Sequence, residues 1–197
     1  MSIPITKDFH HGLLEIVAAL EESTAIYRLY ADGDGLASNT RRIELIRRQF
    51  LDAYRAAAEP APRVLVRMGA VHVGRGTTFV NTFDIGSLTE GIAAANGLNV
   101  LRIAVMPMAG QITRIQPNGS FATVSYEDSS GGIWSATGVD ATLLDEDGWS
   151  LIPLAPIRGR FSQQELDSLS NATRFLLLGY DYIVTTGKAR GATPLVP

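Results

Sequence analysis

The sequence predicts an α/β protein with a mainly parallel sheet flanked by helices. Three short apolar segments, 64–68, 99–106 and 180–186, have the length and continuous hydrophobicity of buried strands. A segment with helical periodicity, 84–96, separates the first two, and strands joined through a helix normally lie parallel in one sheet. The region at about 111–160 is broken by glycines, which predicts an irregular β-containing insertion with one hairpin and a half-exposed strand over 121–126.

Four helices are expected to cover this sheet. They span 8–31, 39–58, 84–96 and 162–179, and the last opens with the Ser-x-x-Glu pattern of a capping box. In the first helix, apolar residues recur at steps of three and four, so one face is expected to turn inward. The residues of that face are Phe9, Leu13, Ile16, Val17, Leu20 and Tyr27.

Composition narrows the class of protein. With 197 residues, 46% of them hydrophobic and 19% charged, the chain is expected to form a single α/β domain over 1–197. A net charge of -3, without an arginine run interleaved with aromatics, argues against nucleic-acid binding. The chain has no cysteine for a disulfide or a thiolate nucleophile. A signal-peptide pattern and an apolar run of roughly 20 residues are both missing, so we expect a cytoplasmic protein that does not span a membrane.

His72 is the candidate catalytic residue. It follows the predicted strand 64–68, and in open α/β sheets ligands bind beyond the carboxyl ends of strands. A neutral imidazole there can act as a general base, although a lone loop histidine is often a structural hydrogen-bonding group. His10 and His11 are adjacent and point about 100° apart on a helix, so they are expected to be surface residues, and no metal site is predicted.

The loop after His72 carries the candidate substrate-binding residues Gly74, Arg75 and Gly76. Glycines let a backbone approach an anion closely, and arginine can hold an oxyanion or a carboxylate. The glycine spacing matches neither the Walker nor the dinucleotide-binding pattern, so a phosphate loop is only weakly indicated.

Arg41 and Arg42 fall in the first turn of the predicted second helix, for which Ser38 is the expected cap. Positive charge at that end opposes the helix dipole at a cost of only fractions of a kcal/mol. A solvated surface and a functional site are both open interpretations, and Arg42 is kept as a candidate substrate-binding residue.

Four runs of sequence carry a family resemblance: VLVRMGAVHVGRG, DIGSLTEGIAAANG, NVLRIAVMPMAGQ and GYDYIVTTGKARGATPLVP. In this order they resemble the later half of erythromycin esterase-like proteins, over roughly residues 40–197. The wider superfamily includes ChaN-like haem-binding proteins and metal-dependent peptidases, so the resemblance leaves the cofactor unknown. It implies that His72 and Arg75 are the distal histidine and arginine of the family's second motif, and that Arg42 opens the preceding helix.

The chain also departs from the family pattern. Gly69-Ala70 stand where the esterase branch usually has His-Asn, and Ile43 and Ile46 replace acidic and methionine positions. The family's earlier motif, with a glycine, a glutamate and the base histidine, would lie upstream of Met1. The resemblance therefore implies the C-terminal portion of a larger erythromycin esterase-like domain, or a diverged member that lacks half of the site, with weak or no activity in this chain alone.

Two classes of function remain open. The first is a hydrolase that opens an ester bond of a small molecule by general-base attack of water, with His72 assisting and Arg42 or Arg75 holding the oxyanion. The second is a non-catalytic ligand-binding or scaffold module, haem-binding-like or specific for another small molecule. We expect all three residues to converge on one pocket, and an uncovered sheet edge to favour a homo-oligomer or a partner.

Overall fold

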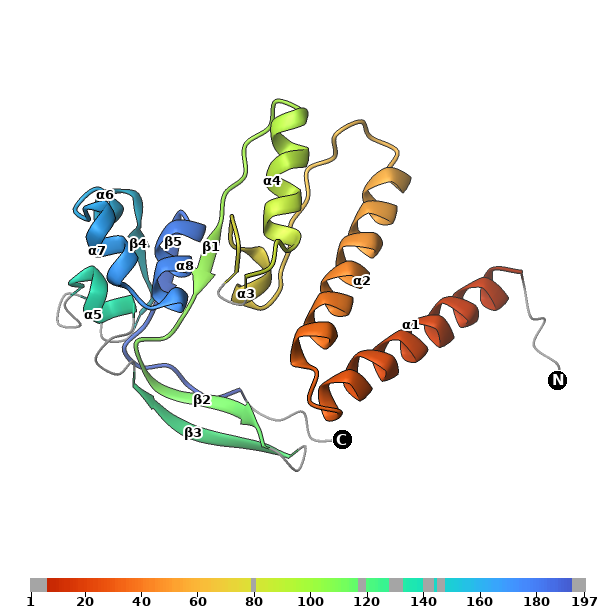
Figure 1. Ribbon diagram of the computed structural model, residues 1–197, viewed down its shortest axis with the longest axis horizontal. Coiled ribbons are helices and arrows are strands. Elements are labelled where there is room, and N and C mark those ends of the chain that lie inside the picture. Colours follow the sequence, from red (N-terminus) through yellow and green to blue (C-terminus); the bar gives the residue numbers. More distant parts are fainter. Residues whose placement is uncertain are drawn as a thin grey trace. The chain divides into compact units, whose positions relative to one another are not determined.

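The computed structural model describes residues 7–78, 81–116, 120–127, 133–139, 144 and 148–192. Their contacts divide the chain into two compact units, 1–63 and 64–197, which are taken in turn below. Figure 1 labels the helices and strands in chain order. Whether the two units form the single domain expected from the sequence stays a prediction.

The first unit is a hairpin of two long helices, α1 (Lys7–Ala31) and α2 (Gly35–Ala56) (Figure 1). Gly33 adopts a left-handed φ of +86° in the turn, a conformation that glycine reaches without a steric penalty. Asp34 caps α2 because its carboxylate accepts a hydrogen bond of 2.9 Å from the Ala37 amide. Deeper in the hairpin, the buried Ser38 hydroxyl donates to the Ile26 carbonyl at 2.9 Å and ties the two helices together.

The face of α1 that was expected to turn inward is exposed. Among the residues of this helix whose burial is described, Ile26 is the buried apolar one, at 3% exposure, and Leu20 is 62% exposed. The expectation is also wrong for four further residues, which are 44–65% exposed: Leu13, Ile16, Val17 and Tyr27. A helix with apolar residues over more than one face can bury only the face that meets its partner, and Ile26 and Ser38 set that face here. The side chains of Phe9, His10 and His11 lie outside the described residues.

The start of α2 also differs from the expectation. The helix begins at Gly35 and not at Asn39, so Ser38 belongs to the first turn and is not the cap. Arg41 and Arg42 consequently lie one turn further in than predicted, away from the helix terminus. Of the residues expected to face inward, Ile43 is buried, at 4% exposure, and Phe50 stacks on Tyr54 with ring centroids 5.8 Å apart.

The second unit is built around a three-stranded sheet in the order β1 (Ile103–Val105), β5 (Tyr182–Thr185) and β4 (Ser150–Pro153). β1 runs parallel to β5, with Ala104 opposite Ile183, and β4 runs antiparallel to β5. The predicted strands near 99–106 and 180–186 are therefore present and paired. The sheet is mixed, because the region expected to be an insertion contributes the antiparallel strand β4.

The predicted strand over 64–68 is wrong. This segment takes no part in a strand, and Leu65 is 94% exposed and Val64 51% exposed. A strand needs a hydrogen-bonded neighbour, and the backbone hydrogen bonds found among the described residues do not involve 64–68. The apolar run thus has strand composition without a strand's pairing, and β1 forms one edge of the described sheet.

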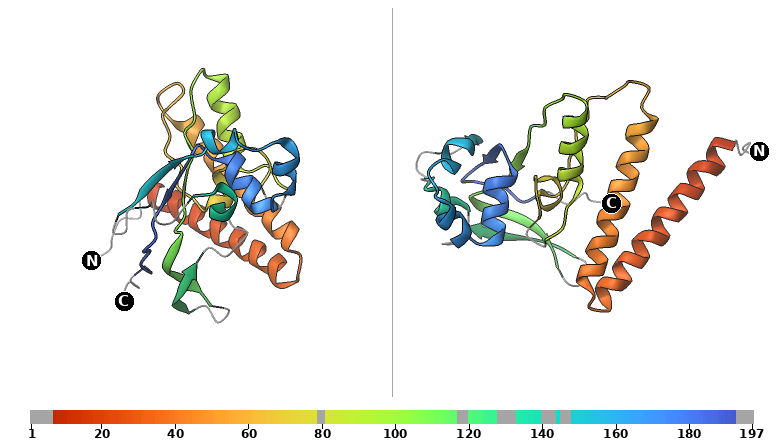
Figure 2. Two further views of the ribbon diagram at one scale, coloured as in Figure 1. Left: turned by 90° about the vertical axis from the view of Figure 1, so that its left-hand side faces the viewer. Right: turned by 45° about the horizontal axis from the view of Figure 1, so that its top comes forward.

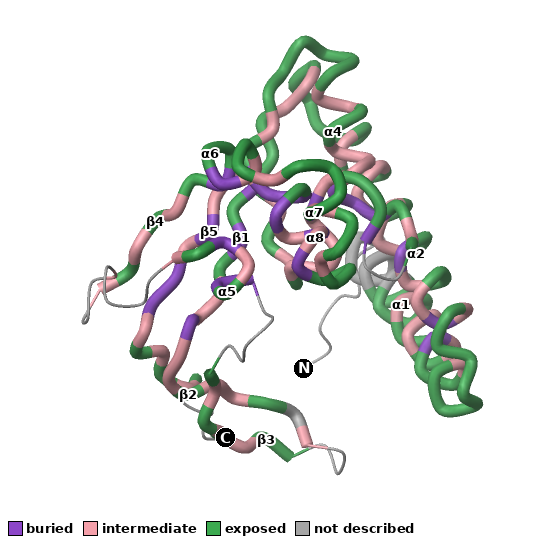
Figure 3. Tube along the Cα trace, turned by 60° about the vertical axis from the view of Figure 1, so that its left-hand side comes forward, coloured by how far each residue is buried: buried purple, intermediate pink, exposed green. Residues whose placement is uncertain are grey.

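The hydrophobic core of the second unit lies against the central strand. Leu154, Leu177, Tyr180 and Ile183 have no exposed surface, and Ala104 is 1% exposed. Figure 3 shows this buried zone along β5 and α8 (Asn171–Gly179). Because the core and the parallel strand pair coincide, the chain around Tyr180 is held firmly.

A two-stranded antiparallel hairpin, β2 (Ala109–Ile115) and β3 (Phe121–Glu127), confirms the predicted hairpin and half-exposed strand (Figure 2). The chain near Ala189 runs alongside it through a bridge to Gly110. Two short helices, α5 (Ile133–Thr137) and α6 (Ala155–Arg158), also fall within the region 111–160 that was expected to be irregular.

The remaining helices of the second unit are α3 (Ala70–Val73), α4 (Ile85–Ala95), α7 (Gln163–Ser168) and α8. α4 matches its prediction, and the capping box between Ser162 and Glu165 is present. The prediction of a single helix over 162–179 is wrong. The backbone is extended at Leu169, where α7 ends, and a new helix begins at Asn171. Ser170 causes the restart: its side chain accepts a hydrogen bond of 3.1 Å from the Thr173 amide and caps α8.

Candidate functional site

His72 lies in α3, which is a single helical turn, and hydrogen bonds to the backbone hold this turn in place. Its amide donates to the Gly69 carbonyl at 2.9 Å. The hydroxyl of Tyr180 donates to the Ala70 carbonyl in the same turn. Tyr180 is fully buried, and this burial raises the pKa of its phenol well above the ordinary value, so it remains a neutral donor. α3 is therefore anchored to the core through Tyr180.

The imidazole of His72 is paired with the carboxylate of Asp84. The distance from Nδ1 of His72 to Oδ2 of Asp84 is 2.7 Å, and the side chains are 16% and 1% exposed respectively. The other carboxylate oxygen accepts a hydrogen bond of 2.6 Å from the Ile85 amide, because Asp84 is also the N-cap of α4. A carboxylate at this distance accepts, so Nδ1 carries the proton and Nε2 of the neutral ring keeps a lone pair.

This pairing has the geometry of a base and the group that orients it. The helix cap fixes Asp84, Asp84 fixes the imidazole, and Nε2 is left as the proton acceptor. The predicted catalytic residue thus has a partner that can hold its orientation and stabilise its protonated form. No group of three or more metal-ligating side chains occurs among the described residues.

Gly74 allows the loop after α3 to lie close to Phe175 of α8, and Gly86 allows the start of α4 to lie close to the backbone of the same loop. A Cβ at Gly74 would lie 2.7 Å from Cε2 of Phe175, and one at Gly86 would overlap the Gly74 carbonyl. Gly76 differs, since it has a left-handed φ of +78° with open space around it, and its carbonyl accepts from the Ser87 hydroxyl at 2.7 Å. Gly74 is therefore explained by packing, and a substrate-binding role for both glycines stays a prediction.

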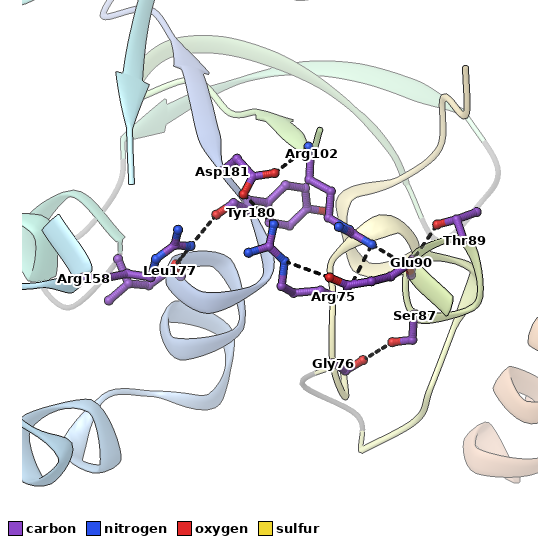
Figure 4. A network of polar contacts seen from close by, with 11 residues as sticks. Arg75, Gly76, Ser87, Thr89, Glu90, Arg102, Arg158, Leu177, Tyr180 and Asp181 are labelled. Atoms are coloured by element: carbon purple, nitrogen blue, oxygen red, sulfur yellow. Dashed lines mark hydrogen bonds and ion pairs between the residues drawn. The ribbon is translucent and has the colours of Figure 1, made fainter. Parts of the chain in front are cut away.

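Arg75 belongs to a network of charged groups in the second unit (Figure 4). Its guanidinium donates to Asp181, and its Nε lies 4.0 Å from Oε1 of Glu90. Arg102, whose side chain is 4% exposed, donates to the Gly86 carbonyl at 2.8 Å and lies 3.4 Å from Glu90. The backbone amide of Arg102 donates to the second oxygen of Asp181 at 2.9 Å.

The network is electrostatically compensated, with two arginines facing two carboxylates. Burial lowers the pKa of Arg102 below its ordinary value, and the charge of Glu90 opposes this shift. Burial alone would raise the pKa of Asp181, but hydrogen bonds from the Arg102 amide and the Arg75 guanidinium, with the charges of both arginines, bring it below its ordinary value. Arg75 thus has structural partners, and its role towards a substrate stays a prediction.

Arg42 belongs to the first unit. Its guanidinium carbon lies 5.6 Å from the centre of the Tyr27 ring, which is a cation–π distance, and the neighbouring Arg41 forms two hydrogen bonds of 2.9 Å with Glu22. Both arginines therefore have partners within the helical hairpin. The expected convergence of Arg42 with His72 and Arg75 stays a prediction.

Only part of the site could be predicted from the sequence. A helix starting at residue 84 was predicted, but the contact of Asp84 with His72 depends on how α3 and α4 pack. The roles of Arg102, Asp181 and Tyr180 were missed, since each acts through residues far away in the sequence. No sequence signal marked Asp181, because it lies at the amino end of β5, whereas ligand sites in open α/β sheets lie beyond the carboxyl ends of strands.

Comparisons with protein-family models, curated proteins and solved structures find no match to this chain. None of the helices in the described part of the chain is long and apolar enough to cross a membrane.

Proposed function

We propose that this chain is an erythromycin esterase-like hydrolase for small-molecule esters, in which His72 is the general base. The observation that supports it is the His72–Asp84 pair, with 2.7 Å between Nδ1 and Oδ2 and a carboxylate that is 1% exposed. A buried carboxylate fixed by a helix cap keeps the imidazole in one tautomer and one orientation, as general-base catalysis requires.

In the proposed reaction, Nε2 of His72 removes a proton from a water molecule whose oxygen attacks the ester carbonyl carbon. The bond from that carbon to the alcohol oxygen then breaks, and the proton passes from His72 to the leaving oxygen, giving a carboxylic acid and an alcohol. Arg75 would stabilise the oxyanion. Because the Arg75 guanidinium already contacts Asp181 and Glu90, we expect slow turnover.

The proposal also covers the fold, the cellular location and the self-association of the enzyme. The parallel pairing of β1 and β5 supports the mainly parallel sheet of the family, while the antiparallel β4 does not. A cytoplasmic location, a small-molecule substrate and self-association as a homo-oligomer belong to the same proposal. The side chains of Ile103 and Val105 on the edge strand β1 are 44% and 63% exposed, which favours contact with another chain.

Hydrolysis of p-nitrophenyl acetate by the purified chain tests the catalytic role. We expect His72→Gln to reduce the rate to that of buffer, and Asp84→Asn to reduce it at least about tenfold, because a lost proton-transfer group typically costs 10²- to 10⁴-fold. Asp167→Asn is the matched control, since it removes a carboxylate with a 56% exposed side chain. Circular dichroism on each variant separates loss of catalysis from loss of fold.

The second candidate is a non-catalytic ligand-binding or scaffold module, haem-binding-like or specific for another small molecule. The observation that favours it is that Gly74 and Arg75 are explained by packing and by ion pairs. If the wild type and His72→Gln both hydrolyse the ester no faster than buffer while remaining folded, the hydrolase proposal is wrong for this chain and the binding module is preferred.

A further inference from the structure

The second unit contains a small cavity between the loop that follows α3 and one face of α8. Its volume is about 190 Å³. Arg75 and Thr78 line it from the loop side, and Asn171, Arg174, Phe175 and Leu178 line it from α8. The four helix residues recur at steps of three, one and three, so they lie on one face of the helix.

Arg174 supplies a positive charge that is only loosely held. Its guanidinium lies 3.5 Å from Asp167 and 3.4 Å from the side-chain oxygen of Asn171. Charge-assisted hydrogen bonds between nitrogen and a carboxylate are normally about 2.7–2.9 Å long, so neither contact is a strong one. The side chain is 40% exposed, and its donors can turn to a ligand without breaking a tight pair.

Arg75 supplies a second positive charge to the cavity lining, and its guanidinium is held more firmly than that of Arg174. Its contact with Asp181 holds the guanidinium in place, and its Nε is buried without a hydrogen-bond partner among the described residues. Glu90, at 4.0 Å, lies beyond hydrogen-bonding distance of this nitrogen. With Arg102, which lies 3.4 Å from Glu90, three arginines face the three carboxylates of Asp181, Glu90 and Asp167, so the cluster is close to neutral, which favours a ligand with one negative charge over a multiply charged one.

The remaining wall is apolar. Phe175 is 6% exposed and is fixed by an edge-to-face contact with Tyr180, with ring centroids 6.1 Å apart. Leu178 is 39% exposed and extends this surface towards solvent. A purely inorganic anion would leave these two side chains unused, whereas a ligand with a short hydrocarbon chain would cover them.

We propose that this cavity binds a small monocarboxylate, with its carboxylate between Arg174 and Arg75 and its hydrocarbon chain on Phe175 and Leu178. A volume of about 190 Å³ equals that of about six water molecules at roughly 30 Å³ each, so a ligand of about six non-hydrogen atoms fits. The proposal goes beyond hydrolysis, because binding here requires neither His72 nor turnover.

Isothermal titration calorimetry with sodium butyrate on the full chain tests this site. We expect saturable binding of butyrate, and at least about tenfold weaker binding of the neutral isostere butyramide, because charge-assisted hydrogen bonds are roughly twice as strong as neutral ones. Arg174→Gln should weaken butyrate binding by a similar factor, and Arg174→Lys should retain part of it. Arg160→Gln, an exposed arginine outside the cavity lining, is the control and should bind butyrate like the wild type.

Three results would overturn the proposal: no saturable butyrate binding, equal binding of butyrate and butyramide, or binding unchanged by Arg174→Gln. Tighter binding of inorganic phosphate than of butyrate would also contradict it, because the apolar wall would then contribute nothing. His72→Gln should bind butyrate normally. Failure of the carboxylate site and failure of the hydrolase proposal are thereby distinguishable.

Discussion

The two units of this chain have similar proportions of apolar residues but differ in how far they bury them. In the helical hairpin the buried hydrophobic residues among those described are Ile26 and Ile43, while Leu13, Leu20 and Tyr27 are largely exposed. In the second unit the chain around Tyr180 and Ile183 has no exposed surface. The difference teaches that apolar composition and periodicity show what a segment could bury, while only its partners decide what it does bury.

The largest expected effect of a substitution is in the core of the second unit. Leu177→Ala removes a fully buried side chain and should lower the free energy of unfolding by about 2–5 kcal/mol, through lost transfer energy and the cavity left behind. Both tryptophans, Trp134 and Trp149, lie in this unit, so urea unfolding followed by fluorescence reports on it.

Leu20→Ala makes the matched change in the hairpin, where the side chain is 62% exposed. We expect a change within about 0.5 kcal/mol, measured by circular dichroism at 222 nm. A loss of several kcal/mol at Leu20 would mean that this surface is covered in solution, and would remove the contrast between the units.

A smaller effect is expected from Asp181→Asn, which removes the carboxylate that accepts from the Arg75 guanidinium and the Arg102 amide and leaves Glu90 as the remaining carboxylate beside both arginines. We expect a loss of about 1–3 kcal/mol at pH 7, less than for a fully buried pair because the carboxylate is 23% exposed. The pKa of Asp181 is lowered by folding, so its stabilisation is present above the unfolded pKa of about 3.9 and is lost as pH falls through the lower, folded value.

Urea titrations of wild type and Asp181→Asn between pH 7 and pH 2.5 measure this dependence. The difference between the two proteins should stay constant down to about pH 4.5 and then shrink. A difference that persists unchanged at the lowest pH would show that the Asn side chain acts through packing and not through the lost charge.

A smaller effect on stability is expected from a substitution at the break between α7 and α8. Ser170→Ala removes the cap of α8 and should cost about 1 kcal/mol, whereas Ser170→Gly should cost only a few tenths. Thermal unfolding followed by tryptophan fluorescence measures both. Equal stability of the alanine variant and the wild type would mean that α8 is held by its core contacts alone.

The smallest effect is expected in the hairpin, at the ion pair between Arg41 and Glu22. The hydrogen bonds from Arg41 lower the pKa of Glu22, so its stabilisation is present above the ordinary carboxyl pKa and is lost as pH falls through the folded value. Both side chains contact solvent, so Glu22→Gln should reduce the melting temperature of the hairpin only slightly, and 1 M NaCl should abolish the difference. A decrease that persists in high salt would indicate a role for Glu22 other than this ion pair.

The features that were predicted correctly depend on residues close together in the sequence. α4 follows from its helical periodicity, and the start of α7 follows from the four residues of its capping box. The single helix over 162–179 failed because a second serine cap at Ser170 competes with an apolar pattern that continues across it.

The features that were missed depend on partners distant in the sequence. The segment 64–68 has strand composition, but a strand forms only when another backbone supplies its hydrogen bonds. For the same reason His72 was recognised as a candidate while its pairing with Asp84, twelve residues away, was not. A sequence pattern can nominate a base, but the group that orients it appears only once two helices are packed.

The close contact at Gly86 has a consequence for how this chain can change over generations. A side chain of any size at this position would overlap the backbone carbonyl of Gly74, and backbone cannot repack as a neighbouring side chain could. No second substitution elsewhere readily restores the space. We therefore expect descendants of this gene to keep glycine at 86 even where ester hydrolysis or ligand binding has been lost, so its persistence would report on architecture and not on chemistry.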